Sequence, residues 1–543
     1  MEMMNTKWIA TVASIWIQTC SGAYTFGIYS PVLKSSQGYD QSTLDLISVF
    51  KEVGGNAGVL AGVLYAFVTT GNSRLRLGCF SGPWVVIFAG AVQWFVGFFM
   101  MWASVVGLIP RLPVPVMCLF IGLAYHGQVF CNTTNLVTGV HNFRDYGGSI
   151  LGILKGYFGL GGAILVQFYQ IAWKGNPANF ILLLALLPTA VWLSLMTLVR
   201  NYDNTSTKLD DKKHLNAISA VALITAAYLM IIILLENMFT LPSLARIISF
   251  AFLMLLAVSP LVIVIRAHKK DSSSFSQTLL IIEKDYQSNA TSVVDSADYV
   301  KLPSEEGQST RATIDNERYL SDEENMNIWQ AFRSGNFWLL FIAMFCGLGT
   351  VTAVMDNLSQ IGESLGYTTA EINSVISLTS IWNFLGRIGA GVVSDMCMHR
   401  YGWTRPIFIV VTLAVLVIGQ IVIVIDFPKS LFLSSVLVGI CDGSLWLLMT
   451  VIISELFGLQ HMGIIFNTIS IASPVGSYIF SVKVVGYFYD MVANSETHVC
   501  LGTRCFMLSL SITASITFCG ALVALALFFR TKRVIYVNYR SRC

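Results

Sequence analysis

Residues 386–405 read GRIGAGVVSDMCMHRYGWTR, and this stretch decides the fold class. It starts as a glycine-rich apolar helix that carries Arg387, and it ends in a short polar segment with Asp395, Arg400 and Arg405. Small residues allow membrane helices to pack closely. The stretch therefore predicts helices that slide past one another and lock again at the cytoplasmic face of a membrane.

The composition is that of an integral membrane protein. Of 543 residues, 55% are hydrophobic and 12% are charged, with a mean hydropathy of +0.68. About a quarter of the residues are charged in soluble proteins, so a soluble globular fold is excluded. The net charge of +3 gives no basis for nucleic-acid binding. The eleven cysteines lack the spacing of metal ligands, so we predict neither a metal nor a cofactor.

Fourteen apolar segments are long enough to cross a bilayer, which takes a helix of about 20 residues. They lie at residues 8–33, 44–69, 83–103, 115–138, 149–172, 180–199, 217–235, 244–266, 337–357, 371–393, 406–425, 431–453, 465–485 and 506–529. Whether 217–235 and 244–266 both span stays open. The predicted fold class is an all-α polytopic membrane protein.

The chain is divided by one polar segment. Residues from about 267 to 330 are rich in Ser, Asp, Glu and Asn, and such a chain buries too little apolar surface to fold. We therefore predict that this segment is a disordered cytoplasmic linker. Its residues Ser321–Glu324 are a candidate for regulation by phosphorylation, and a plain solvated spacer is the alternative. The predicted units are 1–200 (N-terminal six-helix half), 201–266 (two additional helices), 267–336 (linker), 337–530 (C-terminal six-helix half) and 531–543 (tail).

Lysine and arginine in short loops predict the orientation, because these residues are enriched on the cytoplasmic side. If the N-terminus is cytoplasmic, most of these cations lie inside, including Arg74, Arg144, Lys212 and Arg400. We predict a multi-pass membrane protein with both termini in the cytoplasm. The plasma membrane and an internal membrane both stay open as locations.

Four motifs carry a resemblance to known transporters. Residues 391–405 resemble the Gly-x-x-x-Asp-x-x-x-x-Arg-x-Gly-x-x-Arg signature of the major facilitator superfamily. Residues 50–60 (FKEVGGNAGVL), 151–160 (LGILKGYFGL) and 454–467 (SELFGL, then Gly463 and Asn467) resemble the plant nodulin-like transporters, a group that includes the nuclear-fusion-defective-four-like proteins. This group is related to the oxalate–formate and monocarboxylate carriers. The resemblance implies two six-helix halves around a central cavity, with two extra helices between the halves.

The same resemblance implies a cytoplasmic gate. The polar segment after the glycine-rich helix is similar to a superfamily latch that forms ion pairs with a neighbouring helix end. In this sequence the gate residues are Gly391, Asp395, Arg400 and Arg405.

Arg387 is the first candidate for binding a solute. An ionisable group within a span is costly and usually faces the interior of the bundle. Asn383 lies one turn away on the same helix face. A guanidinium group suits a carboxylate because two parallel hydrogen bonds can form. Residues 383–387 also resemble the segment that holds an arginine in oxalate-type carriers; an interhelical ion pair is the alternative.

Lys51 is the candidate for a second cation. Oxalate-type carriers have one on the penultimate helix, where this chain reads ASPVG at residues 472–476. Glycines share the face of Lys51, so its side chain is predicted to point into the protein. The alternative is an ion pair with neighbouring Glu52 or another acid, although residues 51 and 52 point about 100° apart and are not a ready mutual pair.

Asp442 is the candidate for proton coupling. It falls near the middle of the span 431–453, where burial disfavours the charged form of a carboxyl group. A coupling site must load and unload a proton during transport. The alternative role is that of a partner for a buried Arg or Lys.

A polar stripe marks the fourth span. Gln128, Asn132 and Asn135 lie on one helix face, which His126 does not share. Gln128 and Asn132 are therefore predicted to line a solute cavity. Polar contacts between helices, worth about 1 kcal/mol each, are the alternative. Outside the membrane, Cys500 and Cys505 are a candidate disulfide in a polar loop.

These observations predict a secondary active transporter that moves a small, anionic, carboxylate-type solute by alternating access, with protons as a candidate coupling ion. Its partners are the solute and the lipid bilayer, not nucleic acid, and we expect a monomer. The alternative is a membrane organiser or transceptor that keeps the fold without transport, with a role in membrane fusion or signalling. Residues 1–543 contain no His-Glu-x-x-His or Gly-x-Ser-x-Gly motif, so we do not expect an enzyme.

Overall fold

The structure is a computed structural model of the chain. It describes residues 6–22, 25–39, 41–69, 82–172, 177–202, 208–238, 242, 244–266, 326–425, 429–492, 500 and 502–542. Within these ranges the secondary structure is helical and contains no strand. The part of the predicted linker at 267–325, including Ser321–Glu324, lies outside the described residues.

The N-terminal half and the two helices after it occupy residues 7–266. The helices are α1 (Lys7–Thr19), α2 (Phe26–Gln37), α3 (Gln41–Asn56), α4 (Val59–Thr69), α5 (Trp84–Val106), α6 (Val114–Asn142), α7 (Gly147–Ala172), α8 (Pro177–Leu195), α9 (Lys208–Met238) and the helix Leu244–Arg266.

The C-terminal half begins at α12. Its helices are α12 (Ile328–Arg333), α13 (Gly335–Asp356), α14 (Leu358–Ser364), α15 (Thr369–Tyr401), α16 (Pro406–Ile425), α17 (Ser430–Phe457), α18 (Met462–Ser470), α19 (Ala472–Ser477), α20 (Tyr487–Val492) and α21 (Arg504–Arg542). A π-helical segment, Tyr478–Gly486, joins α19 to α20.

Twelve helices in the described part of the chain are long and apolar enough to cross a membrane. The helix α15 is not among them, although it has 33 residues, and it carries Arg387 and Asp395 along its length. The predicted first span is divided, because α1 ends at Thr19 and α2 begins at Phe26. With α15 and the α1–α2 pair, the arrangement agrees with the predicted polytopic bundle.

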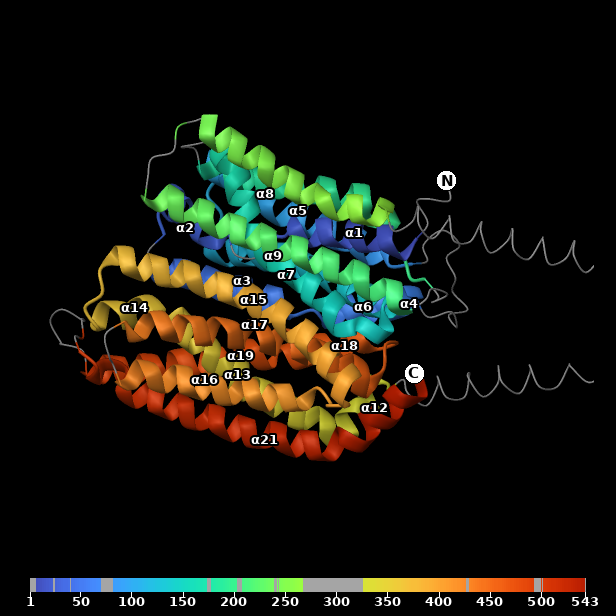
Figure 1. Cartoon of the computed structure of the whole chain (residues 1–543). Coiled ribbons are helices and arrows are strands. Elements are labelled where there is room, and N and C mark those ends of the chain that lie inside the picture. The colour runs from blue at the N-terminus through green and yellow to red at the C-terminus, as the bar shows by residue number, and fades with distance from the viewer. Residues whose placement is uncertain are drawn as a thin grey trace, which may run out of the picture.

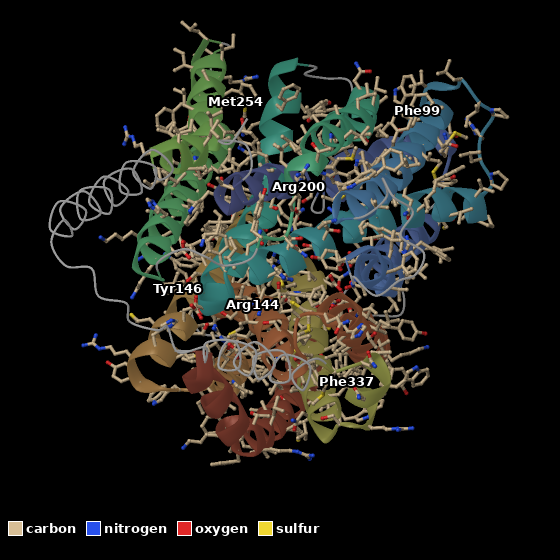
Figure 2. All side chains as sticks on the ribbon, turned by 90° about the vertical axis from the view of Figure 1, so that its right-hand side faces the viewer. Phe99, Arg144, Tyr146, Arg200, Met254 and Phe337 are labelled. Atoms are coloured by element: carbon tan, nitrogen blue, oxygen red, sulfur yellow. A yellow bond between two sulfur atoms is a disulfide. The ribbon has the colours of Figure 1, made fainter. Side chains whose placement is uncertain are left out.

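The two halves lie side by side with their helices roughly parallel (Figure 1). The helices α1 to α9 form the upper part in this view, and α12 to α21 form the lower part. The helix Leu244–Arg266 packs on the N-terminal half: the indole of Trp16 donates a hydrogen bond of 2.8 Å to the carbonyl of Ala257. Seen from the end of the bundle, Arg144 and Tyr146 lie near the boundary between the halves (Figure 2).

The structure departs from the predicted units at two boundaries. Residues 328–336, which we expected in the linker, form α12 and the first turn of α13. The Asn327 side chain caps α12 in a capping box with Gln330, which gives this short helix a defined start. The predicted tail is also helical as far as it is described, since α21 continues to Arg542.

Glycines bring the central helices close together. A Cβ atom on Gly443 of α17 would overlap the carbonyl oxygen of Asn383 on α15, and one on Gly386 would overlap that of Ile440. Between the halves, Gly391 of α15 and Gly148 of α7 meet in the same way. The backbones of α7, α15 and α17 therefore approach closely, and polar side chains from all three meet at their junction.

Candidate solute site and cytoplasmic latch

Arg387 lies at the junction of the two halves. It is on α15, is 4% exposed, and donates a hydrogen bond of 3.0 Å from Nη1 to the carbonyl oxygen of Lys155 on α7. Gly159, one turn further along α7, leaves room for the guanidinium group: a Cβ there would lie 3.9 Å from Nη1. The guanidinium is thus enclosed by protein and bridges the N- and C-terminal halves.

Asn383 and Asp442 meet beside Arg387. The amide of Asn383 donates a hydrogen bond to the carboxylate of Asp442 on α17, and both side chains are buried. The carboxylate also interacts electrostatically with Arg387 and Lys155. The structure therefore brings Asp442 together with Arg387 and Asn383, which the sequence had placed on one helix face.

Lys155 is the member of this cluster that the sequence analysis did not select. Its side chain is buried, and its ammonium group lies 4.8 Å from the ring centre of Phe466 and 5.4 Å from that of Trp446. Within the described ranges no carboxylate lies within 4.0 Å of this ammonium group. The rule that selected Lys51, an ionisable residue within a glycine-rich span, could also have found Lys155.

Lys51 lies apart from this cluster, and it pairs with its neighbour Glu52. Its ammonium group forms an ion pair of 2.7 Å with Glu52, which we did not expect from the angle between the two residues. It also lies 5.3 Å from the ring centre of Phe26 and 6.0 Å from that of Tyr125. Across the two halves it interacts electrostatically with Asp356, at the end of α13. These contacts do not include any member of the Arg387 cluster.

The polar stripe of α6 faces α1. Asn132 accepts a hydrogen bond of 3.0 Å from the side-chain amide of Gln18. Gln128, one turn earlier on α6, is 5% exposed. Asn135 is buried and donates a hydrogen bond to the carbonyl of Cys131 on its own helix. His126 points to α5, where its Nδ1 lies 2.6 Å from Oε1 of Gln93.

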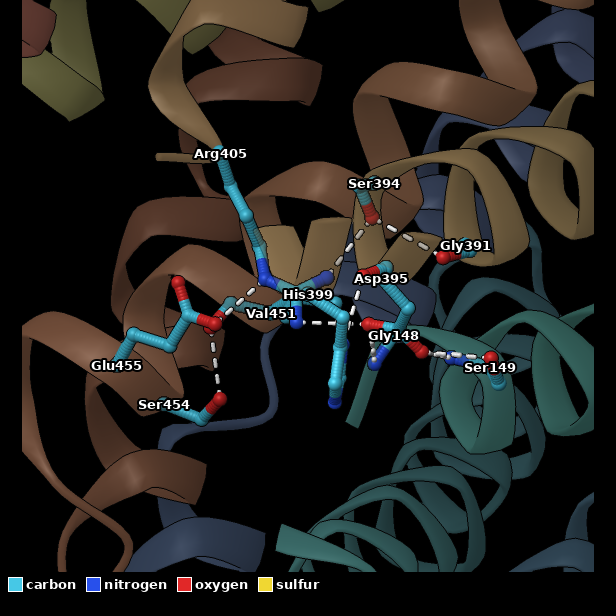
Figure 3. Close-up of polar contacts among 10 residues, drawn as sticks. All are labelled: Gly148, Ser149, Gly391, Ser394, Asp395, His399, Arg405, Val451, Ser454 and Glu455. Carbon is cyan, nitrogen blue, oxygen red and sulfur yellow. Dashed lines mark hydrogen bonds and ion pairs between the residues drawn. The ribbon is translucent and has the colours of Figure 1, made fainter. Parts of the chain in front are cut away.

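The predicted latch joins the two halves through Asp395 (Figure 3). Its carboxylate accepts hydrogen bonds from the backbone amides of Gly148 and Ser149, at 3.2 and 2.6 Å, and from the Ser149 hydroxyl, at 2.6 Å. These amides belong to the first turn of α7. A helix N-terminus has unpaired N–H groups and a positive dipole end, so a carboxylate is well placed there.

Arg405 holds the other side of Asp395. The two form an ion pair of 2.7 Å, and Arg405 forms a second ion pair of 2.5 Å with Glu455 at the end of α17. It also donates a hydrogen bond of 2.8 Å to the Ser394 hydroxyl (Figure 3). Burial alone lowers the pKa of Arg405, but the carboxylates of Glu455 and Asp395 outweigh it and raise the pKa. Arg405 therefore stays charged and orients Asp395 toward α7.

Gly391 and Arg400 occupy different places in this region. Gly391 lies against the backbone of Gly148, where a side chain would separate α15 from α7. Arg400 is exposed, and its guanidinium lies 5.7 Å from the ring centre of Tyr401. The structure thus groups Gly391, Asp395 and Arg405, while Arg400 stands outside the ion pairs in this conformation.

Other contacts between the halves occur between α4, α6 and α18. Asn467 donates a hydrogen bond of 2.9 Å to the Thr133 hydroxyl, and Gly62 of α4 lies against the backbone of Gly463. A disulfide joins Cys500, before α21, to Cys505 in the first turn of α21. No group of three or more His, Cys, Asp and Glu residues that could hold a metal ion occurs among the described residues.

The family assignment follows from two domain matches. A family model described as Nodulin-like matches residues 7–265, and the C-terminal domain of NFD4 matches residues 322–537. The chain therefore contains a Nodulin-like domain followed by an NFD4 C-terminal domain.

The chain is similar in sequence to two named proteins. It is 25% identical to Protein NUCLEAR FUSION DEFECTIVE 4 of Arabidopsis thaliana, covering 98% of this chain and 90% of the relative. It is 22% identical to the "Probable transporter MCH1" of Candida glabrata, covering 39% of this chain and 45% of that protein.

Solved structures with the same fold are major facilitator transporters. A double-tryptophan mutant of XylE aligns with a TM-score of 0.55 at 13% identity, covering 98% of both chains. The proton:xylose symporter XylE bound to 6-bromo-6-deoxy-D-glucose aligns with a TM-score of 0.53 at 11% identity, covering 96% of this chain and 95% of that chain. The FucP transporter in the outward conformation aligns with a TM-score of 0.51 at 13% identity, covering 96% and 99%. The nodulin-like protein thus has the major facilitator fold.

Proposed function

We propose that this protein is a secondary active transporter for a small carboxylate anion, working by alternating access and coupled to protons. The observation that supports this most directly is that two buried cations of the described residues lie at the junction of the halves. Arg387 and Lys155 are both buried there, and Asp442 is the carboxylate that interacts with both.

An anionic solute would balance this charge. Burying two cations with one carboxylate is unfavourable, because each ion loses its hydration. A solute carboxylate that enters the junction gains two cationic partners, and Arg387 offers it a planar fork of donors. Lys155 supplies the second cation for which the sequence analysis had considered Lys51.

Asp442 suits the coupling role because it shares these cations with the solute. When Asp442 is ionised, it competes with a solute carboxylate for Arg387 and Lys155. When it binds a proton, the competition is removed and the solute binds more tightly. Proton and solute would therefore bind together, which is the requirement for symport.

The latch accounts for one half of the transport cycle. In this conformation Asp395 and the first turn of α7 hold the two halves together. Release of these hydrogen bonds would allow the halves to separate at that end. Asp395, Arg405 and Gly391 would then form the cytoplasmic gate.

Uptake into proteoliposomes tests the solute site. The panel contains mono- and dicarboxylates, amino acids and sugars, and the variants are Arg387→Ala, Arg387→Lys, Lys155→Met and Lys155→Arg. We expect carboxylate uptake by the wild type, its loss in Arg387→Ala and Lys155→Met, and partial uptake in the two charge-conserving variants. Lys483→Met is the control, since Lys483 is exposed and contacts Tyr478. Equal uptake by Arg387→Ala and wild type for every transported solute would remove Arg387 from the site.

A membrane organiser or transceptor is the second candidate, because the relative from Arabidopsis thaliana carries the name NUCLEAR FUSION DEFECTIVE 4. It predicts that purified wild-type protein moves none of these solutes. It also predicts that Arg387→Ala restores the phenotype of a cell lacking the protein as well as wild type does.

A further inference from the structure

A cluster of uncharged polar side chains lies in the N-terminal half, apart from the charged groups of the proposed site. The side-chain amide of Gln18 on α1 donates a hydrogen bond of 3.0 Å to Asn132 on α6. Gln128 lies one turn before Asn132 on the same face of α6, and Ser21 lies one turn beyond Gln18 in the segment after α1. We call Gln18, Ser21, Gln128 and Asn132 the amide cluster.

Two members of the amide cluster are buried without a partner in the described part of the chain. The Nε2 atom of Gln128 and the Oγ atom of Ser21 make no hydrogen bond there, and the residues are 5% and 2% exposed. Buried polar groups in native proteins are almost always hydrogen-bonded, so an exception calls for an explanation. A ligand that donates and accepts hydrogen bonds at this position would supply the missing partners.

The amide cluster is connected to the cationic groups through two sets of contacts. Gly161 of α7 packs against the carbonyl of Ser21, and it lies six residues, or about 9 Å of helix, from Lys155. On the other side, Thr133 follows Asn132 and accepts a hydrogen bond from Asn467, while the neighbouring Phe466 ring lies under the Lys155 ammonium. Helix α7 thus carries Lys155 and packs against Ser21, while α18 contacts both Lys155 and the residue next to Asn132.

We propose that the amide cluster is a second subsite that binds the hydroxyl groups of the solute whose carboxylate binds Arg387 and Lys155. This inference rests on the proposed function, and it narrows the solute to a small hydroxycarboxylate. The cluster contains donors and acceptors but no charge, so it matches a hydroxyl group, which both donates and accepts. A site built to bond a hydroxyl group rejects the analogue that lacks it, because its own polar groups then stay unpaired.

Competition assays with matched acids test this inference. Uptake of the best labelled carboxylate into proteoliposomes is measured in the presence of unlabelled malate, tartrate or succinate. The inhibition constants of malate and of tartrate are each compared with that of succinate. We expect the wild type to bind the hydroxylated acid about tenfold more tightly or better than succinate. Gln128→Met keeps the size of the side chain and removes the amide. The ratio of the inhibition constant of succinate to that of the hydroxylated acid should therefore fall toward one, while the inhibition constant of succinate changes less than about twofold.

Gln420→Met is the matched control, because Gln420 is a buried glutamine of the other half that accepts a hydrogen bond from Thr517. It should keep the wild-type ratio. Gln18→Met is the second variant, and it should lower the ratio even if Gln128→Met fails to fold. An unchanged ratio in the folded variants overturns the subsite. If uptake needs Arg387 but the ratio does not move, the subsite alone is wrong; if uptake is independent of Arg387, the proposed function fails as well.

Discussion

The carboxylate of Asp395 on α15 accepts two hydrogen bonds of 2.6 Å from Ser149 on α7, one from the backbone amide and one from the hydroxyl group. The two residues are separated by 246 positions in the chain and belong to different halves. A single carboxylate therefore caps a helix of the other half and joins the two halves at that end.

Asp395→Asn is expected to favour opening at the latch. Hydrogen bonds to a charged group contribute about 1.5–3 kcal/mol each, so the closed state should lose at least about tenfold in relative population. Spin labels at Lys212 on α9 and at Trp403, directly after α15, both exposed positions, would report this as a longer distance.

The control for the latch is Arg400→Ala, measured with the same two labels. Because Arg400 contacts Tyr401 and not Asp395, this substitution should leave the distance distribution unchanged. A shift as large as that of Asp395→Asn would assign Arg400 to the latch after all.

Lys51 and Asp356 are expected to pair when the halves close at the end opposite the latch. In this structure Lys51 forms its ion pair with Glu52, while Asp356 accepts a hydrogen bond of 3.3 Å from Ser477. The variants Lys51→Asp and Asp356→Lys should each slow uptake about tenfold by placing like charges together. The double exchange should restore most of the rate. Absence of restoration, with all three proteins folded, contradicts the pairing.

Asp442→Asn is expected to remove the pH dependence of uptake. In the wild type, lowering the external pH should increase uptake, because protonation of Asp442 frees Arg387 and Lys155 for the solute. The asparagine side chain cannot ionise, so the initial uptake rate of this variant should stay constant between about pH 5 and about pH 8. A wild-type slope that persists in the variant means that another group carries the proton.

Gly443→Ala is expected to destabilise the protein, because the new methyl group would overlap the carbonyl of Asn383. Overpacking of this kind costs about 1–3 kcal/mol, which should appear as a lower melting temperature in detergent. Gly389→Ala is the matched control on the adjoining helix, since a Cβ there has no neighbour within 4 Å. Equal melting temperatures for both variants would show that α15 and α17 separate at no cost.

Much of the fold could be predicted from the sequence, because the signal for a spanning helix is local. In a bilayer, a run of about 20 apolar residues must satisfy its backbone hydrogen bonds within itself and therefore forms a helix, whatever its neighbours are. Arg387, Asn383 and Asp442 could be selected for the same reason, since each interrupts such a run. Their meeting between α15 and α17 depends on Gly443 and Gly386, and that is a tertiary contact.

The contacts between the halves and around the candidate site could not be predicted, because they depend on residues that are far apart in the sequence. The capping of α7 by Asp395 requires the docking of two helices from different halves. Lys51 reaches Glu52 although their Cα–Cβ directions differ, because a lysine has a flexible four-carbon stem that a helical projection ignores. Lys155 was visible as a charge within a span, but only its proximity to Arg387 and Asp442 gives it a role.

The π-helical segment Tyr478–Gly486 is a point in this half where the helix can change its twist. A π-helix bonds each amide to the carbonyl five residues back, so the return of one turn to α geometry would twist α20 against α19 without breaking the chain. Tyr489 on α20 accepts a hydrogen bond of 3.2 Å from the amide of Cys500, and Gly502 donates one of 2.8 Å to the carbonyl of Ser364, the last residue of α14. With the disulfide between Cys500 and Cys505, these bonds connect α20 and α21 to α14, the short helix that precedes the helix holding Arg387.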